Sequence, residues 1–433
     1  MFAISAIAYL DRVNISIAGG SIRNEFGLDN IRLGWVFSSF VLGYAFFQAP
    51  GGRLADRFGP RRILALAAIW WAAFTALVAA VPAGIPGAFT VLLAARFLLG
   101  VGEGMVFPAS NRLVAAWIPT GERGAANGLI FAGVGAGAGI TPPFITFILL
   151  HYGWRPSFCI CAGIGLVAGL VWYRIARDRP EEHPWVKPAE LDHIRSGLPK
   201  QATQTRETVP WRVILGSRSV WALTVSYFAF GYVSYIFFTW FFLYLSAVRG
   251  LDLKASAFFG MLPFLAMAAF SPLGGLLSDR LTRRYGHRTG RCGLPVVSMA
   301  IAAGFLVLAM QARDARVASI VLAGGAGVLY LSTSCFWSVT ADIAGRSAGT
   351  VSGVMNMGNQ IGGAVTASLT PVLASVFGWS SSFLVAAGLC GIGAVAWLAV
   401  DPRRAVASGG LKQPIEQRNT TGHDPADAKS IAT

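Results

Sequence analysis

Four ionisable side chains stand within long apolar stretches of this sequence, where charged residues are otherwise rare. Asp11 and Arg12 are neighbours in the first stretch, and Arg96 and Glu103 share a later one. An ionisable side chain inside a membrane span costs about 2.5–3.5 kcal/mol on insertion scales. Each of the four therefore needs either a function or a partner.

These residue types suit the binding of an anion and the movement of a proton. A guanidinium stays charged and can bind a carboxylate through two parallel hydrogen bonds, so we expect Arg12 to hold an anionic substrate. Tyr9 and Tyr44 are the expected hydroxyl donors beside it. A carboxyl group in apolar surroundings takes up a proton more readily than an exposed one, so Asp11 and Glu103 are the candidate proton carriers. Sodium as the coupling ion stays open.

A fixed salt-bridge network between two helices is the alternative for the same residues. Neighbouring positions on a helix diverge by about 100°, so Asp11 and Arg12 should point in different directions. Arg96 and Glu103 are about two helical turns apart and present opposite charges on one face. For Arg96 the structural role is the favoured one.

Membrane helices must position these residues, because the composition excludes a soluble globule. Of 433 residues, 55% are hydrophobic and 13% are charged, whereas a soluble domain averages about 25% charged residues. Disorder, a collagen-like fibre and a disulfide scaffold are excluded as well. About 20 apolar residues cross a bilayer. Twelve stretches of roughly that length occur, near residues 1–19, 33–50, 63–82, 88–117, 124–150, 154–176, 218–246, 255–277, 292–311, 316–341, 348–375 and 379–400.

The basic surplus is a signal of membrane topology. Thirty-five Lys and Arg against 20 Asp and Glu leave a net charge of +15, which in a soluble protein would suggest a nucleic-acid partner. Here the basic residues gather in alternate connections, as in Arg57–Arg62, Arg174–Arg179 and Arg280–Arg284. By the positive-inside bias, those connections and both termini face the cytoplasm. We expect a lipid bilayer as the partner and no nucleic acid.

The twelve stretches divide into two groups of six. The predicted units are an N-terminal bundle over 1–176, a cytoplasmic linker over 177–216 with one short helix near residues 189–196, a C-terminal bundle over 217–400, and a disordered cytoplasmic tail over 401–433. The proline-rich, mixed-charge composition of the linker and the polar composition of the tail support these boundaries.

An internal repeat relates the two groups. Gly51-Gly-Arg-Leu-Ala-Asp-Arg57 returns as Gly274-Gly-Leu-Leu-Ser-Asp-Arg280, an offset of 223 residues. Tyr152-Gly-Trp-Arg-Pro-Ser-Phe158 returns as Phe377-Gly-Trp-Ser-Ser-Ser-Phe383, an offset of 225. Two duplicated six-helix halves are typical of a transporter that rocks around a site at their interface.

Two sets of residues make the chain resemble the major facilitator superfamily and, within it, the anion:cation symporters. The segment Gly52-Arg-Leu-Ala-Asp-Arg-Phe-Gly-Pro-Arg-Arg62 is similar to the superfamily's motif between its second and third helices. The closer likeness lies in Tyr9–Asn14, Arg96–Glu103 and Arg179–Trp185. Nearly the whole chain is covered. Met1 already falls inside the first span, so we expect either a natural start upstream or a short first span.

The resemblance implies the fold and the activity. The fold is all-α and integral to the membrane, with twelve transmembrane helices in two six-helix bundles, the major facilitator fold. The activity is proton-coupled uptake of a small organic anion, a sugar acid or another carboxylate, by alternating access in the bacterial inner membrane. Arg12 would bind the anion, and Asp11 and Glu103 would carry the protons. A drug or metabolite exporter of the same fold, working by proton antiport, is the alternative.

The resemblance also completes the predicted site. It favours Trp337 and Asn356 as cavity residues, and Gln48 joins them because it shares a helix face with Tyr44. Ala132-Gly-Val134 stands where sugar-acid relatives carry a polar residue, which leaves room for a less polar or aromatic anion. No enzyme activity, cofactor or metal is expected, and the chain is expected to be a monomer. The predicted gating residues are Gly52, Asp56, Arg57, Arg96, Asp279 and Arg280.

Overall fold

The structure is a computed structural model that describes residues 1–198, 209–241, 244–251 and 253–406, and these ranges contain helices and no strand. Nine helical segments there are long and apolar enough to cross a membrane, and one of them, Ala315–Phe377, contains three consecutive helices. Most of the predicted tail, residues 407–433, and part of the predicted linker, residues 199–208, lie outside the described residues.

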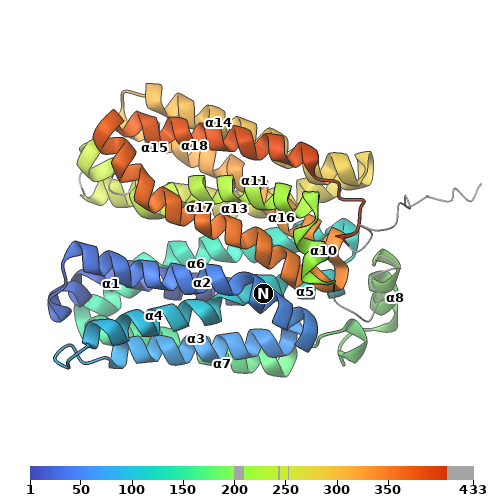
Figure 1. Ribbon diagram of the computed structural model, residues 1–433, viewed down its shortest axis with the longest axis horizontal. Helices are drawn as coiled ribbons and strands as arrows, with labels where there is room; N and C mark the ends of the chain where they lie inside the picture. Colours follow the sequence, from blue (N-terminus) through green and yellow to red (C-terminus); the bar gives the residue numbers. More distant parts are fainter. Residues whose placement is uncertain (199–208, 242–243, 252, 407–433) are drawn as a thin grey trace, which may run out of the picture.

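The first half of the chain forms one bundle, drawn in blue and teal in Figure 1. Its helices are α1 (Phe2–Phe26), α2 (Asn30–Phe58), α3 (Pro60–Ala80), α4 (Ala88–Gly104), α5 (Val106–Trp117), α6 (Arg123–Tyr152) and α7 (Trp154–Ile175), with the short turn η1 (Thr120–Glu122) before α6. The fourth predicted span is divided into α4 and α5 at Met105. Pro108 lies in the first turn of α5 and has no N–H to donate to the turn before it, which accounts for the break.

The second half forms a second bundle beside the first (Figure 1). Its elements are α11 (Arg218–Tyr235), η3 (Ile236–Trp240), η4 (Tyr244–Val248), α13 (Leu253–Tyr285), η5 (Thr289–Gly293), α14 (Leu294–Gln311), α15 (Ala315–Tyr330), α16 (Thr333–Ala344), η6 (Gly345–Ser347), α17 (Ala348–Phe377), α18 (Trp379–Ala396) and η7 (Trp397–Ala399).

Between the bundles the chain forms η2 (Pro180–Glu182), α8 (Pro188–Gly197) and α10 (Trp211–Leu215). The helix expected near residues 189–196 is therefore present as α8. Both α8 and α10 lie at the same end of the molecule, called here the linker end (Figure 1).

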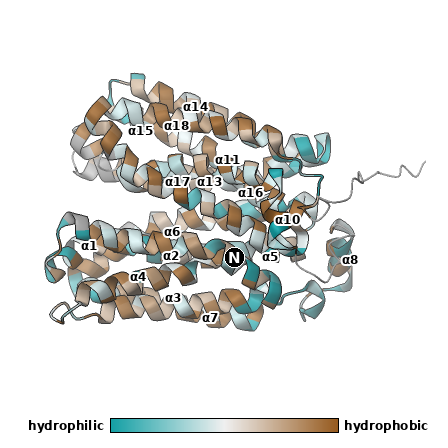
Figure 2. Ribbon diagram, in the orientation of Figure 1, coloured by the Kyte–Doolittle hydropathy of each residue, from teal (hydrophilic) through white to brown (hydrophobic). Residues whose placement is uncertain are grey.

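The first two helices are long enough to cross a bilayer although they are not among the nine most apolar segments. α1 has 25 residues and α2 has 29, which correspond to lengths of about 37 and 43 Å at about 1.5 Å per residue. Asp11 and Arg12 lower the hydropathy of α1 in its middle. Figure 2 shows hydrophobic residues along the middle of both bundles and hydrophilic residues gathered at their ends.

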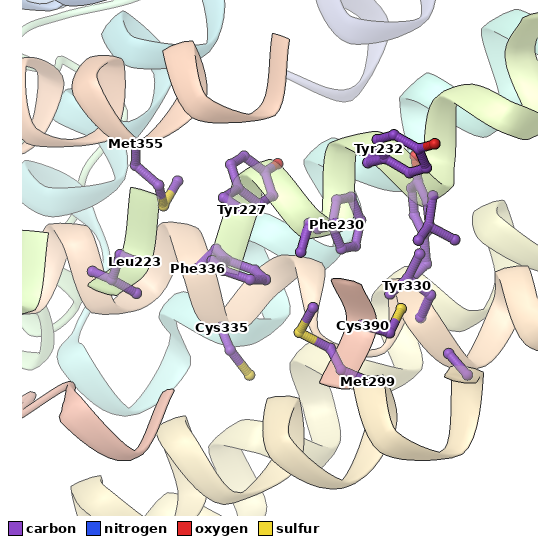
Figure 3. Close-up of a cluster of buried hydrophobic side chains, with 14 of the residues drawn as sticks. Leu223, Tyr227, Phe230, Tyr232, Met299, Tyr330, Cys335, Phe336, Met355 and Cys390 are labelled. Carbon is purple, nitrogen blue, oxygen red and sulfur yellow. The ribbon is translucent and has the colours of Figure 1, made fainter. Parts of the chain in front are cut away.

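The apolar interior of the second bundle continues into the facing helices of the first bundle through residues such as Phe107 and Phe131. In the second bundle, Tyr227 and Phe230 of α11 pack against Phe336 of α16, and their ring centroids lie 4.5 and 5.8 Å from that of Phe336 (Figure 3). Cys335 and Cys390 fill space in the same cluster and are fully buried. These cysteines act as small apolar side chains.

A close crossing of α2 and α4 brings the charged residues of the first bundle together. A Cβ atom on Gly43 would collide with the carbonyl oxygen of Phe97, and one on Gly100 would collide with the backbone of Phe40 and Tyr44. Glycine at both positions therefore lets the two backbones touch, as small residues do in membrane helix pairs. Tyr44 is thereby held near the two charged residues of α4.

This crossing can be tested by adding a side chain. We expect Gly100→Leu to force the two helices apart, with a destabilisation of about 1–3 kcal/mol or more from overpacking. The matched control is Gly304→Leu in α14, because a Cβ on the exposed Gly304 would meet no atom within 4 Å. The measurement is the melting temperature of each purified variant in detergent. Equal melting temperatures for the two variants would show that the crossing does not constrain the bundle.

Candidate functional site

The site is built around Arg12, which lies in the middle of α1. Its Nη2 atom is 3.6 Å from Oε1 of Glu103 on α4, and its Nη1 donates a 3.3 Å hydrogen bond to the hydroxyl of Tyr9. Neither carboxylate oxygen of Glu103, a residue only 1% exposed, has a hydrogen-bond partner. The ion pair with Arg12 is therefore the main compensation for this buried carboxylate.

Aromatic rings surround the Arg12 guanidinium on several sides. Its central carbon lies 4.2 Å from the ring centroid of Tyr44, 4.7 Å from that of Tyr9 and 5.2 Å from that of Phe40. A cation over aromatic faces is attracted by their quadrupoles, and Arg suits this stacking better than Lys. Nε and Nη2 of Arg12 form no hydrogen bond, so the cation keeps donors for a further acceptor.

Asp11 points away from Arg12, as expected for neighbours on a helix. Its Oδ2 atom accepts a 2.8 Å hydrogen bond from the hydroxyl of Thr75 on α3, and its Oδ1 atom has no hydrogen-bond partner. Arg96 is also buried, with its guanidinium carbon 4.7 Å from the ring centroid of Phe40. Two cations and two carboxylates therefore lie inside the first bundle, and their formal charges sum to zero when both acids are ionised.

A pocket lies between the two bundles. Four predicted substrate-binding residues line it, namely Tyr9, Tyr44, Trp337 and Asn356. Arg12 does not line the cavity itself but lies directly behind Tyr9 and Tyr44. The other lining residues are Phe107, Phe131 and Val134 from the first bundle and Tyr227, Phe230, Ser234, Tyr235, Phe238, Tyr330, Thr333, Asn359 and Gln360 from the second.

Amide side chains connect the bundles beside the cavity. Nδ2 of Asn356 on α17 donates a 2.9 Å hydrogen bond to Oε1 of Gln48 on α2, and both residues are buried. The hydroxyl of Tyr235 donates a 2.6 Å bond to Oε1 of Gln360. Gln48 is thus a bridge to a cavity residue rather than a lining residue. Asn359 and Gln360 are the amide side chains absent from the predicted site, although they share a helix face with Asn356.

At the linker end, two aspartates join the bundles through helix N-termini. Asp56 at the end of α2 accepts hydrogen bonds from the backbone N–H groups of Gly349 and Thr350, at 3.0 and 2.7 Å, and a bond from the Thr350 hydroxyl. These N–H groups belong to the first turn of α17, whose partial positive charge favours an acid there.

The second aspartate repeats this arrangement with the halves exchanged. Asp279 of α13 accepts from the N–H groups of Gly124 and Ala125 at the start of α6, at 3.0 and 2.7 Å. The two aspartates are 223 residues apart, and the two capped helix starts are 225 residues apart. The internal repeat therefore produces two reciprocal caps, in which each half supplies the acid for the other.

The remaining predicted gating residues divide by location. A Cβ atom on Gly52 would collide with the carbonyl group of Gly349, so this glycine permits the contact between α2 and α17. Arg57 and Arg280 are exposed beside the caps. Arg96 lies in the interior of the first bundle, among the charged residues described above.

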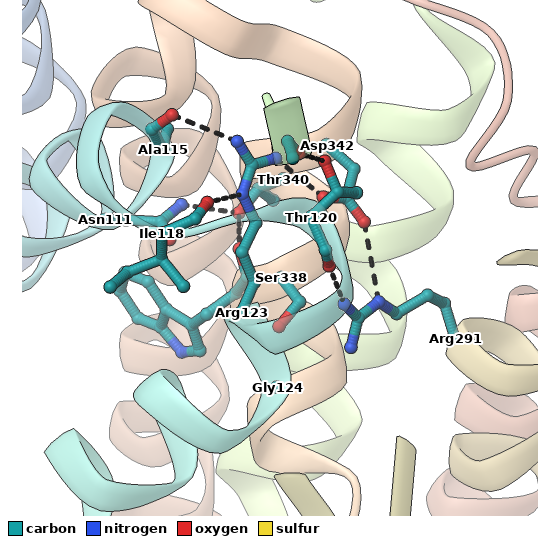
Figure 4. Close-up of polar contacts among 12 residues, drawn as sticks. Asn111, Ala115, Ile118, Thr120, Arg123, Gly124, Arg291, Ser338, Thr340 and Asp342 are labelled. Carbon is teal, nitrogen blue, oxygen red and sulfur yellow. Dashed lines mark hydrogen bonds and ion pairs between the residues drawn. The ribbon is translucent and has the colours of Figure 1, made fainter. Parts of the chain in front are cut away.

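A buried ion network that the sequence analysis missed lies beside the Asp279 cap, and Figure 4 shows its residues Arg123, Arg291 and Asp342. Arg291 of η5 pairs with Asp279 at 2.6 Å and with Asp342 of α16 at 3.5 Å. Arg123 of α6 pairs with Asp342 at 2.7 Å and so joins the bundles. Asn111 of α5 donates a 2.8 Å bond to the Thr340 hydroxyl. The 225-residue offset locates both helix starts, but it places the uncharged Ala348 and Trp117 opposite Arg123 and Asp342, so the repeat gives no signal for this network.

The linker also contacts both bundles at this end. The guanidinium of Arg53 on α2 donates a 2.7 Å hydrogen bond to the carbonyl of Val209, and the N–H of Val209 donates a 2.8 Å bond to the Ser347 hydroxyl in η6. The backbone of Val209 in the linker is thus hydrogen-bonded to both bundles. Polar contacts between the bundles gather at the linker end, and this end is closed in the structure.

Removing one cap should loosen the closed end. We expect Asp56→Ala to shift the protein toward an open linker end, because several hydrogen bonds to a charged acceptor are lost, each contributing about 1.5–3 kcal/mol. The measurement is maleimide labelling of a cysteine introduced by Asn127→Cys, a buried position at this end, in a cysteine-free background. Labelling should rise about tenfold or more. Arg57→Ala is the control at the adjacent exposed residue, and equal labelling of the two variants would contradict a role for the cap.

Comparison with known proteins places this geometry in a family. The chain is 37% identical to the probable sulfoacetate transporter SauU of Cupriavidus necator, over 93% of this chain and 92% of that protein. It is 29% identical to the probable galactarate/D-glucarate transporter GudP of Bacillus subtilis, over 91% and 89% of the two chains. It is also 29% identical to the hexuronate transporter of Bacillus subtilis, over 90% of each chain.

A solved structure confirms the predicted fold. The proton:xylose symporter XylE, bound to 6-bromo-6-deoxy-D-glucose, superposes with a TM-score of 0.72 at 17% identity, over 91% of this chain and 93% of that chain. A sequence profile described as Major Facilitator Superfamily matches residues 1–367. With the two bundles, the internal repeat and the reciprocal caps, these matches show that the chain belongs to the major facilitator superfamily.

Proposed function

We propose that this protein takes up a small organic anion together with protons, by alternating access between its two bundles in the bacterial inner membrane. The observation that carries the proposal is Arg12, a half-buried cation behind the wall of a pocket between the bundles, whose Nε and Nη2 atoms make no hydrogen bond. The three curated relatives described above are named as transporters of organic acids, which supports an anionic substrate.

The contacts of Arg12 suggest how substrate and proton are coupled. A substrate carboxylate that displaces the Tyr9 hydroxyl would reach the guanidinium and compete with Glu103 for it. Protonation of Glu103 removes that competitor, so proton uptake favours anion binding at Arg12. The reverse order applies on release, because loss of the proton restores the internal ion pair.

The buried charges support the same coupling. With both acids ionised, Asp11 and Glu103 balance Arg12 and Arg96, and a bound anion would leave an uncompensated negative charge away from water. Uncompensated buried charge is costly, so a proton on Glu103 makes the loaded state easier to form. Asp11 is the second proposed carrier, because its Oδ1 atom is buried without a partner.

Transport then requires the closed linker end to open. The proposed gate consists of the two reciprocal caps, with Gly52 allowing the helices to meet. By the distribution of basic residues, this end faces the cytoplasm, so the present conformation would release nothing to that side. Opening requires both caps to separate, and closing forms them again.

Neutralising Glu103 should separate accumulation from exchange. In proteoliposomes with an imposed proton gradient, we expect Glu103→Gln to lose uphill accumulation of anion while retaining exchange of labelled for unlabelled anion. The amide cannot take up and release the coupled proton, but it leaves Arg12 free to bind. The control is Glu182→Gln, at an exposed linker residue. Unchanged accumulation in Glu103→Gln would overturn the assignment, and outward anion movement driven by the gradient would favour an exporter.

Replacing Arg12 should weaken anion binding directly. We expect Arg12→Gln to raise the KM for anion exchange about 100-fold or more, because a charge-assisted contact worth about 3 kcal/mol is lost. Arg12→Lys should recover only part of this loss, since an ammonium cannot form the paired hydrogen bonds. The exposed Arg62→Gln is the control for net charge. A wild-type KM in Arg12→Gln would contradict the proposed binding role.

A further inference from the structure

The cavity wall is aromatic and uncharged. Ten of its sixteen described lining residues are Phe, Tyr or Trp, and none is Asp, Glu, Lys or Arg. The rings of Phe107 and Phe131 stack with centroids 5.3 Å apart and an angle of 12° between their planes. Trp337 lies against both, at 5.9 and 5.3 Å. Such a wall gains more from an apolar or aromatic ligand than from a chain of hydroxyl groups.

The charge near this cavity is one-sided. Arg12 stands behind the first-bundle wall, whereas the corresponding part of α11 in the second bundle carries the neutral residues Ser234 and Tyr235. Tyr235 lines the cavity as a neutral residue and hydrogen-bonds to Gln360. Duplication has therefore not produced a second cation among the described lining residues. An anionic group held on the second-bundle side would have no charged partner.

The second-bundle side does offer neutral hydrogen-bonding groups. Asn356 uses its Nδ2 atom on Gln48, which leaves its carbonyl oxygen as an acceptor. Gln360 uses its carbonyl oxygen on Tyr235, which leaves its NH2 group as a donor. Asn359 lies between these two residues in the sequence and lines the cavity with them. These amides suit a hydroxyl, an ether or an amide on the ligand.

We propose that the site selects anions charged at one end only: a monocarboxylate with an aromatic body whose far end carries at most a neutral polar group. The carboxylate is held on the Arg12 side, the ring lies against Phe107, Phe131 and Trp337, and the neutral group meets the α17 amides. This selectivity rests on the proposed binding of a carboxylate by Arg12. A second anionic group at the far end of the ring would be desolvated without a partner, so the site rejects such dianions.

A competition assay with matched compounds tests this selectivity. Exchange of labelled phenylacetate in proteoliposomes of the full-length protein is competed with 4-hydroxyphenylacetate, 4-carboxyphenylacetate and gluconate. We expect the hydroxyl compound to compete at least as well as phenylacetate. The second carboxylate should weaken competition about 100-fold or more. Gluconate has one charge but no ring, and it should also compete more weakly than phenylacetate.

The outcomes distinguish this proposal from the one it rests on. Equal competition by 4-carboxyphenylacetate, or better competition by gluconate, would overturn the selectivity and leave anion transport standing. If no carboxylate is exchanged or competes, both proposals fail.

Two variants test whether the lack of a cation on the second-bundle side of the cavity causes the selectivity. Asn359→Arg places a positive charge on the second-bundle side, and Asn359→Gln is the neutral control of greater length. We expect the ratio of 4-carboxyphenylacetate to phenylacetate affinity to rise about tenfold or more in the arginine variant relative to the glutamine variant. An unchanged ratio in a folded arginine variant would show that far-end charge is not what the cavity discriminates. Wild-type competition decides the question if the arginine variant does not fold.

Discussion

The buried pair between Arg12 and Glu103 constrains the rest of this molecule. Both residues lie in the middle of their bundle, and the Glu103 carboxylate accepts no hydrogen bond. A buried pair of this kind is strongly destabilised when one partner is lost, which makes the pair sensitive to any third charge. The aromatic rings around the guanidinium border the neighbouring cavity, so an anion bound there would lie close to the pair.

The two halves share a backbone plan but differ in their chemistry. At the linker end the repeat is used symmetrically, since Asp56 and Asp279 each cap a helix of the other half. Around the cavity it is used asymmetrically, since Arg12 lies against the rings of Tyr9 and Tyr44 in the first half, whereas the lining amides come from α17 of the second half. Reciprocal caps suit a gate that must close from both sides, whereas a one-sided charge can orient an asymmetric ligand.

Much of this organisation follows from the sequence because membrane helices are selected by local hydropathy. The spans depend on composition and helical spacing, which are local properties, and the repeat can be seen by comparing the two halves of the sequence. Arg123, Arg291 and Asp342 escaped prediction because their pairing depends on how two bundles meet, and pattern within one helix does not encode it. The same reason explains why the hydrogen bond from Asn356 to Gln48 was not predicted. The break at Met105 was not predicted, because the apolar stretch near residues 88–117 continues through it without a polar interruption long enough to divide it.

The two backbone hydrogen bonds of Val209 offer a way to measure how often the linker end opens. Its carbonyl is bonded to Arg53 of one bundle, and its N–H is bonded to Ser347 of the other. When the bundles separate at this end, the chain between them can follow only one, so one of the two bonds must break. If the Ser347 bond breaks, the amide proton becomes free to exchange with solvent deuterium. The exchange rate of that single amide would then report the fraction of time the linker end is open, without any label attached to the protein.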